Sequence, residues 1–279
     1  MHRRPPPHAY FVVSAVFHYL GPAFAVLLFA HVGVLGVAWL RIATAAVVFA
    51  AWRRPWRWYA GLPRPQRRTV IALGVTLAVM NVCFYLAIDR LALGTVAAIE
   101  FLGPTLVAAA GMRTRRNQLA LLLVVLGVYL VTGVRLHGQP IGFAFAFANA
   151  ALFAAYVVLG HRVARAGAGI DALAAAMLVA AVVVSPIGGL AALPALAVPA
   201  TIAAGIGVGI TSSVIPYVCD QLAMARLERS TYALMVSLLP ATAVAVGLVV
   251  LGQVPSPRDA AGVALVMVGV AAHGAAQTG

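Results

Sequence analysis

Three charged side chains lie in or beside long apolar stretches of this chain, and they are the residues best placed to do chemistry. Arg41 and Glu100 sit within hydrophobic runs, and Asp220 lies near the end of another. A charge in the hydrocarbon core of a bilayer is costly, so it usually faces a cavity or a partner. Counted from the outer ends of their helices at about 1.5 Å per residue, Arg41 and Glu100 lie about 15 and 12 Å deep. At matching depth they could form a buried pair that only holds helices together. Alternatively, the pair or Glu100 alone could bind a charged part of a substrate or a proton.

A broken, polar segment surrounds Asp220. Ser212, Ser213, Pro216 and Tyr217 precede it within a few residues. Proline inside a helix leaves a carbonyl without its usual donor, and segments of this kind commonly line transport pathways. Asp220 could instead be an interfacial residue that accepts a bond from one of the arginines that follow it.

Other polar residues in the apolar runs complete the set of candidates. A lone intramembrane His or Tyr is more often hydrogen-bonded between helices than used as a ligand. The residues expected to line a substrate or ion pathway are Arg41, Glu100, Asn81, Tyr85, Tyr156, Tyr217, Asp220 and His18. The prolines that could act as hinges, or simply set the packing geometry, are Pro104, Pro216 and Pro240. The glycines expected at close helix contacts are Gly33, Gly36, Gly205, Gly207 and Gly209.

The sequence contains no enzymatic constellation. It has no HExxH, GxSxG or P-loop motif, and no GxGxxG at a strand–helix turn. Its two cysteines, Cys83 and Cys219, lie in apolar runs without the spacing of a zinc site or a disulfide framework. We therefore expect neither enzyme activity nor a cofactor or resident metal.

The elements that must hold these residues are membrane-spanning helices. Hydrophobic residues make up 63% of the 279 residues and charged residues 9%, too few charges to cover a soluble domain. At about 20 apolar residues per helix plus a short loop, the chain has room for about ten spans. The predicted spans are Tyr10–Ala30, Val32–Trp52, Thr69–Ile88, Ala92–Met112, Gln118–Val134, Ile141–Gly160, Asp171–Ala191, Ala200–Ala223, Ser230–Gly252 and Arg258–Gln277.

The arginines alternate between the two sides of the predicted membrane. With the N-terminus inside, the inner segments hold fifteen of the nineteen arginines, and the outer segments hold Arg90, Arg135 and Arg258. The positive-inside rule then places both termini on the cytoplasmic side of the membrane. We expect this membrane to be a bacterial-type inner membrane. Tryptophans at 52–58 fall where an interfacial aromatic belt belongs. The net charge of +13 is therefore interpreted as membrane topology, and no nucleic-acid partner is expected.

An internal repeat lies beneath the spans. Shifted by 136 residues, Asn81–Gly111 matches Tyr217–Gly247 at twelve of 31 positions, including aligned Cys, Arg, Thr and Pro. The shift carries the third span onto the eighth, so each repeat, 1–136 and 137–279, has five helices. Because five is odd, the halves are inverted, which is typical of secondary transporters with a central site. The predicted fold is an all-α membrane protein of ten transmembrane helices in two inverted five-helix repeats.

Three short segments carry a resemblance to a known family. They are Ala98–Pro104 (AIEFLGP), Trp39–Ala43 (WLRIA) and Leu251–Gly262 (LGQVPSPRDAAG). In order along ten spans, they resemble the EamA family of the drug/metabolite transporter superfamily. The Glu-Phe-x-Gly-Pro motif and the SVIPY segment at 213–217 are most similar to its threonine/homoserine exporter branch. The chain departs from the family pattern at Leu239 and Gln253, where an acidic residue is often found.

The resemblance implies a central cavity and ion-driven export of small metabolites. We expect export of amino acids or related metabolites, with protons as the coupling ion because Glu100 and Asp220 are the acidic residues in spans that could line a cavity. A homodimer is possible. The alternatives are a broad exporter of drugs or organic cations and, in another class, a membrane scaffold or sensor that does not transport.

Overall fold

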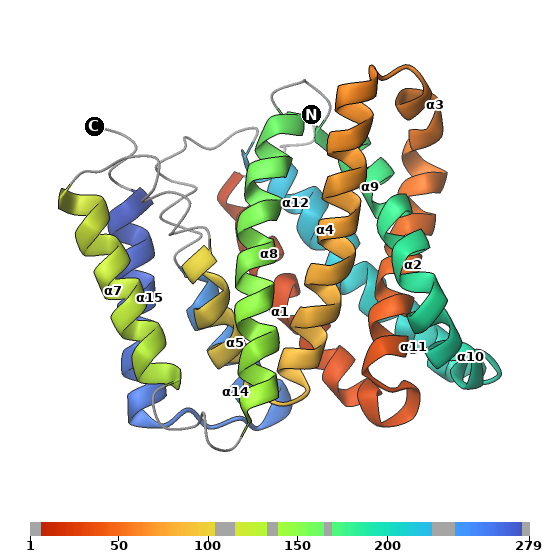
Figure 1. The fold of residues 1–279 in the computed structure, drawn as a ribbon. Helices are drawn as coiled ribbons and strands as arrows, with labels where there is room; N and C mark the ends of the chain where they lie inside the picture. The colour runs from red at the N-terminus through yellow and green to blue at the C-terminus, as the bar shows by residue number, and fades with distance from the viewer. Residues whose placement is uncertain (1–6, 104–114, 133–138, 165–168, 225–237, 275–279) are drawn as a thin grey trace, which may run out of the picture.

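The computed structural model describes residues 7–103, 115–132, 139–164, 169–224 and 238–274, and nearly all of them are helical (Figure 1). No strand occurs in these ranges. The α-helices are α1 (Pro7–Val32), α2 (Val34–Arg53), α3 (Pro55–Ala60), α4 (Arg64–Ile88), α5 (Leu93–Glu100), α7 (Arg115–Thr132), α8 (Pro140–Ala164), α9 (Gly169–Val184), α10 (Leu190–Leu196), α11 (Pro199–Gly209), α12 (Ile215–Met224), α14 (Leu239–Leu251) and α15 (Pro257–Gly274).

Within the described ranges, six helical stretches are long and apolar enough to cross a membrane. They are Ala9–Val32, Val34–Arg53, Arg64–Ile88, Pro140–Gly160, Gly169–Leu196 and Pro199–Cys219. Two shorter apolar helices are Gln118–Val131 and Leu239–Leu251. The prediction of an all-α, multi-pass membrane protein is therefore confirmed. The number of ten spans and the inverted repeat remain predictions.

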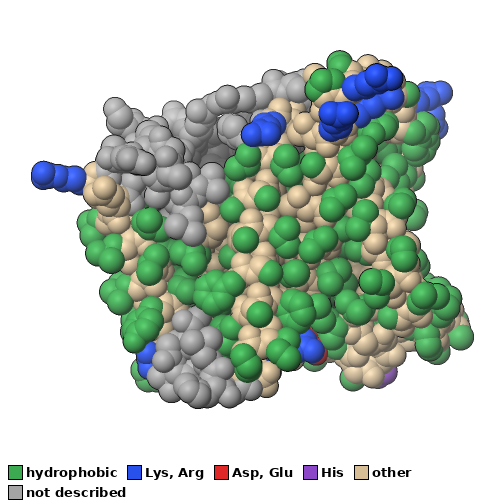
Figure 2. All heavy atoms as spheres, in the orientation of Figure 1, with side chains coloured by type: hydrophobic (Ala, Val, Ile, Leu, Met, Phe, Trp, Pro, Cys, Tyr) green, Lys and Arg blue, Asp and Glu red, His purple; other side chains and the backbone are tan. Residues whose placement is uncertain are grey.

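The outer surface of the bundle suits lipid rather than water. Large hydrophobic side chains point outward along the helices, among them Val47, Val182 and Val249, which are 68%, 72% and 83% exposed. Figure 2 shows hydrophobic side chains across the middle of the visible face, with most of the visible Lys and Arg atoms gathered near one end. A surface of this kind needs a hydrocarbon solvent, because water would leave the apolar area unburied.

The helices pack in a pattern that places α1, α2 and α4 at the centre of the described structure. α4 packs against α8 and α9, whereas α1 packs against α11 and α12, and α2 against α9 and α11. α7 and α15 form a pair at one edge, visible on the left of Figure 1. α14 contacts both α1 and α5. The faces that meet at α1, α2 and α4 enclose the polar residues described below.

Two long helices contain π-helical segments. η1 (Ser185–Gly189) joins α9 to α10, and η2 (Ile210–Val214) joins α11 to α12. Each lies at a proline, because Pro186 is part of η1 and Pro216 follows η2 by two residues. Proline removes a helical donor and crowds the preceding turn, and a wider turn relieves that crowding. π-Helical segments are frequently found at functional sites.

Glycines allow η2 to approach two neighbouring helices closely. A Cβ placed on Gly21 of α1 would lie 2.6 Å from the backbone nitrogen of Ser212. A Cβ on Gly209 would lie 3.0 Å from the carbonyl oxygen of Arg41. Of the glycines expected at close contacts, three face a neighbouring helix or side chain: Gly36, Gly205 and Gly209. The other two, Gly33 and Gly207, have nothing within 4 Å, and Gly33 instead supplies the positive φ of 72° that ends α1.

Candidate functional site

Arg41 is buried in the middle of α2, with 5% of its surface exposed. Its Nε donates to the hydroxyl oxygen of Ser213 at 2.9 Å, and its Nη2 donates to the carbonyl oxygen of Ser212 at 3.0 Å. Its guanidinium carbon lies 5.3 Å from the centre of the Tyr85 ring, which is the geometry of a cation–π contact. Arg41 thereby connects α2 to η2 and to α4.

The proline after η2 explains why a charged donor is needed there. Pro216 has no N–H, so the helix cannot supply the usual donor to the carbonyl of Ser212, four residues earlier. Arg41 supplies that bond. On the far side of the break, Ser14 of α1 donates its hydroxyl to the carbonyl of Pro216 at 3.2 Å. The broken segment is thus stabilised by side chains from two other helices.

Glu100 is the second buried charge. It ends α5 with 6% of its surface exposed, and its Oε1 accepts a hydrogen bond from Nδ2 of Asn149 on α8 at 3.1 Å. No ion pair joins Glu100 to Arg41 among the contacts of the described residues. The two charges are therefore held separately, each by its own polar partners, and the buried pair that their equal depth allowed is not formed.

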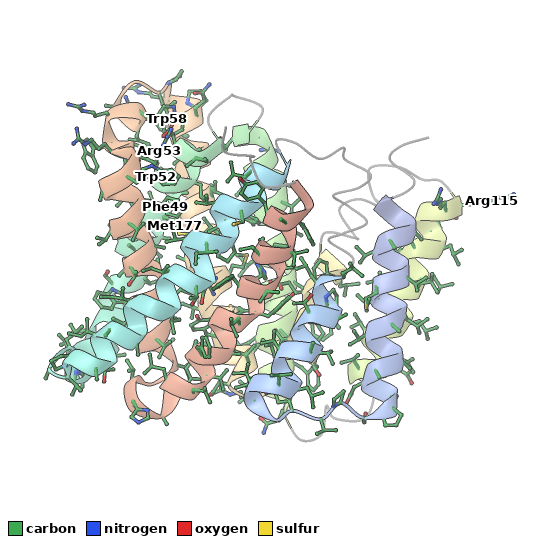
Figure 3. The ribbon with its side chains drawn as sticks, turned by 180° about the vertical axis from the view of Figure 1, so that it is seen from behind. Phe49, Trp52, Arg53, Trp58, Arg115 and Met177 are labelled. Carbon is green, nitrogen blue, oxygen red and sulfur yellow. The ribbon has the colours of Figure 1, made fainter. Side chains whose placement is uncertain are left out.

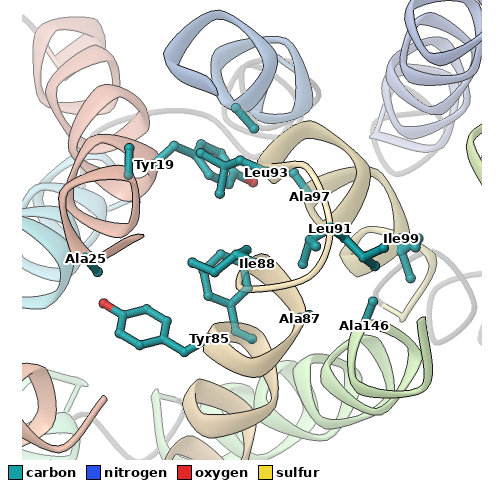
Figure 4. Close-up of a cluster of buried hydrophobic side chains, with 14 of the residues drawn as sticks. Tyr19, Ala25, Tyr85, Ala87, Ile88, Leu91, Leu93, Ala97, Ile99 and Ala146 are labelled. Atoms are coloured by element: carbon teal, nitrogen blue, oxygen red, sulfur yellow. The ribbon is translucent and has the colours of Figure 1, made fainter. Parts of the chain in front are cut away.

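Four polar atoms around these two charges are buried without a hydrogen-bond partner among the described residues. They are the hydroxyl oxygens of Tyr19, Tyr85 and Ser212 and the Oδ1 of Asn149. Figure 4 shows Tyr19 reaching from α1 toward α5 and Tyr85 reaching from α4 toward α1. Buried polar atoms are nearly always hydrogen-bonded, to protein, water or a ligand. These four atoms therefore offer free hydrogen-bonding capacity to a polar molecule.

Four of the predicted pathway residues gather at this site. Arg41, Glu100 and Tyr85 belong to it directly. His18 lies beside Tyr19, with ring centres 5.1 Å apart in an edge-on arrangement.

The other predicted residues lie elsewhere or outside the described part of the chain. Asn81 is buried, but its Nδ2 donates to the carbonyl of Leu77 within α4 at 2.7 Å. Tyr156 stacks on Phe153, and Tyr217 is buried in a hydrophobic cluster with residues of α4 and α9. Pro240 is buried in the first turn of α14. Pro104 and the side chain of Asp220 lie outside what the structure describes.

The sequence alone did not identify Ser14 and Tyr19 as members of the site. A signal for Ser14 exists, because Ser14, His18 and Gly21 follow a spacing of four and three residues, which places them on one face of α1. Tyr19 does not share that spacing. In an otherwise apolar helix, a face of polar and small residues marks the side that meets a polar neighbour.

The site combines a cation, a carboxylate and neutral hydrogen-bonding groups in a buried setting. The described residues contain no cluster of three or more His, Cys, Asp or Glu that could hold a metal ion. The groups present can bind a small molecule that carries both charges, and they contain no nucleophile paired with a base.

Comparisons with known proteins agree with this description. Residues 140–273 match the EamA-like transporter family. The threonine/homoserine exporter RhtA of Escherichia coli strain K12 is 34% identical over 240 residues, which are 85% of this chain and 80% of that protein. The protein of the same name from Salmonella typhimurium strain LT2 is 33% identical over 236 residues, covering 84% of this chain and 79% of its own. A protein of known crystal structure superposes over 98% of this chain and 99% of its own, with a TM-score of 0.61 and 21% identity, and so shares the fold.

Proposed function

Because the chain belongs to the EamA-like transporter family, we propose that it exports threonine, homoserine or closely related amino acids across the bacterial inner membrane. The protein is a multi-pass membrane transporter and not an enzyme. The substrate class is suggested by the relatives, which are exporters of threonine and homoserine by name. The chemistry of the buried site supports the same class, as follows.

The observation that carries the proposal is that Arg41 and Glu100 are both buried and that no ion pair joins them among the described residues. An amino acid at neutral pH carries a carboxylate and an ammonium group a few bonds apart. Arg41 uses two of its five N–H donors on Ser212 and Ser213, which leaves donors free for a carboxylate. Glu100 can accept from the ammonium group, together with the unpartnered Oδ1 of Asn149. A zwitterion would then link the two charges.

The unpartnered hydroxyl groups give the site a reason to prefer a hydroxylated side chain. Tyr19, Tyr85 and Ser212 each present a buried hydroxyl oxygen with no partner in the part of the chain that the structure describes. A substrate hydroxyl can both donate and accept a hydrogen bond, whereas a methyl group leaves these oxygens unsatisfied. A site that hydrogen-bonds a substrate hydroxyl strongly rejects an analogue without that hydroxyl. An apolar pocket rejects an analogue with an added hydroxyl less strongly.

Threonine and valine test this assignment, because they differ by a hydroxyl in place of a methyl group. We expect proteoliposomes containing the protein to export threonine faster than valine. Tyr85→Phe should reduce that preference about two- to twelvefold, the effect of one hydrogen bond of about 0.5–1.5 kcal/mol. Tyr129→Phe, on the outer face of α7, is the matched control. If Tyr85→Phe slows the export of threonine and of valine equally, Tyr85 does not bind the substrate hydroxyl.

We further propose that export is coupled to proton entry through Glu100. The support is that Glu100 is the buried carboxylate of the described site and has a neutral partner, Asn149, rather than a permanent counter-ion. Export from proteoliposomes should accelerate when an inward proton gradient is imposed, and Glu100→Gln should abolish that response. Flux that ignores the gradient in the unmodified protein would contradict proton coupling.

We also propose that the halves are inverted repeats that alternate access to the site. A shift of 136 residues carries α1 onto α8 and α2 onto α9, and it carries α4 onto the segment from α11 to α12. The packing supports this relation, because α4 contacts α8 and α9 while its counterpart contacts α1 and α2. The termini would then be cytoplasmic. Gly61→Cys, in a chain without its native cysteines, should react with an impermeant maleimide only from the inner side.

A further inference from the structure

We propose that the corner formed by the end of α2, by α3 and by the start of α4 is a binding surface for anionic phospholipid headgroups. The arginine corner, as we call it, comprises Trp52, Arg53, Arg54, Trp56, Arg57, Arg64, Arg67 and Arg68. Figure 2 shows Lys and Arg side chains gathered over this end of the bundle, at the upper right. This surface lies apart from the transport site, and the inference does not depend on what the protein exports.

Two arginines of the corner give it a fixed shape. Arg53 donates to both carboxylate oxygens of Asp171 at 2.8 and 3.0 Å, which ties the end of α2 to α9. Arg67 donates to the carbonyl oxygens of Leu62 and Ala60 at 2.8 and 2.5 Å, which closes the loop between α3 and α4. The loop therefore presents the remaining arginines in a defined arrangement.

The other four arginines are exposed and face no acidic partner. Arg54, Arg57, Arg64 and Arg68 have exposed side chains, and no hydrogen bond or ion pair of these side chains is found among the described residues. The sequence from 52 to 88 contains no Asp or Glu, and the acid that reaches the corner, Asp171, is already bound by Arg53. The corner therefore carries an uncompensated positive charge. Guanidinium groups match phosphate oxygens in geometry as well as in charge.

The apolar residues of the corner indicate that the phosphate belongs to a lipid. Trp52 and Trp56 are 52% and 53% exposed, and Val47, which precedes them on α2, is 68% exposed. Figure 3 shows Trp52, Arg53 and Trp58 along this corner, and the guanidinium carbon of Arg53 lies 5.7 Å from the centre of the Trp52 ring, so that aromatic rings and cations share one surface. Trp side chains favour the depth of lipid headgroups, where the ring is apolar and the N–H reaches polar atoms. A soluble anion would gain nothing from these rings.

The corner differs from the turn between α10 and α11. The segment 190–200, which passes from α10 into α11, contains no charged residue. A cluster of arginines is therefore not present at every turn between helices. Because α2 runs without a break from Arg53 to Arg41, twelve residues and about 18 Å away, a lipid held at the corner also restrains the helix that carries the buried cation.

Tryptophan fluorescence can test this proposal, because three of the four tryptophans lie at 52–58. The purified full-length protein in neutral detergent would be titrated with phosphatidylglycerol that carries brominated acyl chains, which quench nearby indole rings. We expect quenching at lower concentrations than with brominated phosphatidylcholine. The triple variant R54Q/R57Q/R68Q should weaken the phosphatidylglycerol effect at least about tenfold, since each arginine near an anionic surface contributes about fivefold.

The matched control removes the same charge from other exposed positions, as R115Q/R116Q/R162Q, and should leave the quenching curve unchanged. Equal quenching by the two lipids, or an unchanged curve in R54Q/R57Q/R68Q, would overturn the proposal. Displacement of the lipid by millimolar inorganic phosphate would assign the corner to soluble anions and would also overturn it. If the triple variant does not fold, added salt in the unmodified protein must remove the preference for phosphatidylglycerol, because exposed charges are screened.

Discussion

The bond from Arg41 to the Ser212 carbonyl predicts an energetic coupling between Arg41 and Pro216, which themselves lie on different helices. Arg41→Gln removes a donor from the Ser212 carbonyl, which lacks the α-helical donor four residues later because position 216 has no N–H. Pro216→Ala restores that N–H. Arg41→Gln should therefore cost less free energy of unfolding in a chain that also carries Pro216→Ala.

The size of the coupling energy between Arg41 and Pro216 follows from the one contact that both substitutions affect, the bond to the Ser212 carbonyl. Arg41→Gln removes bonds to Ser213 and Ser212 and changes a buried charge, so its total cost mixes several terms. A double-mutant cycle cancels all terms except the one that Pro216→Ala alters, which is the bond to the Ser212 carbonyl. Hydrogen bonds within membranes contribute about 0.6 to 1.7 kcal/mol. We expect a coupling energy of about 1 kcal/mol.

The assay is the free energy of unfolding in bicelles for the unmodified chain, both single variants and the double variant. Pro194→Ala in α10 provides the control, since it also restores an N–H inside a helix but no described bond of Arg41 reaches α10. Arg41→Gln and Pro194→Ala should be additive. If Arg41→Gln and Pro216→Ala are also additive, within about 0.3–0.5 kcal/mol, the guanidinium does not replace the missing helical donor.

Three further changes test the packing around the site, each by the unfolding midpoint in detergent. Gly21→Ala should destabilise the protein by about 1–3 kcal/mol, because the added Cβ meets the backbone of η2. Gly207→Ala places its Cβ in open space and should be neutral or stabilising. Equal effects of the two variants would contradict the close approach at Gly21. Gln253→Ala should lower the free energy of unfolding by about 1 kcal/mol, because Gln253 Oε1 accepts a hydrogen bond from the first N–H of α5 at 2.9 Å. Gln253→Glu should retain this bond, so equal losses in the two variants would contradict the role of Gln253. Arg53→Gln and Asp171→Asn should each lower the free energy of unfolding by about 1 kcal/mol or less, and the double variant should lower it by no more than either single variant. A loss of stability that persists in high salt would contradict the assignment of an exposed ion pair.

The depth of the buried charges could be predicted from the sequence, but their partners could not. Helix register alone indicated that Arg41 and Glu100 lie at similar levels of the membrane, and both are buried. Which side chain each one meets depends on how the helices pack around one another. Arg41 bonds to η2 because Gly21 and Gly209 let that segment come close, and Glu100 meets Asn149 of α8. These lateral contacts have no local signature in either residue's own segment.

The prolines illustrate a partial success of the same kind. Pro216 predicted a carbonyl in need of a donor, and the structure places a donor there. The segment itself did not predict that a π-helical turn would form there. It also did not predict that the donor would come from a residue 171 positions earlier in the chain. Asn81 illustrates the opposite case, because a polar residue at a promising position satisfies its amide within its own helix.

The bond between Arg41 and the Ser212 carbonyl has a consequence for how the protein is assembled during synthesis. Each half enters the bilayer with a defect that it cannot repair alone, a cation in the first and an open main-chain acceptor in the second. Both defects are removed when α2 meets η2. Neither half is therefore a self-sufficient membrane domain. The docking of the second half onto the first removes both of these defects, so two fragments expressed separately should each be short-lived and should stabilise each other when they are made in the same cell.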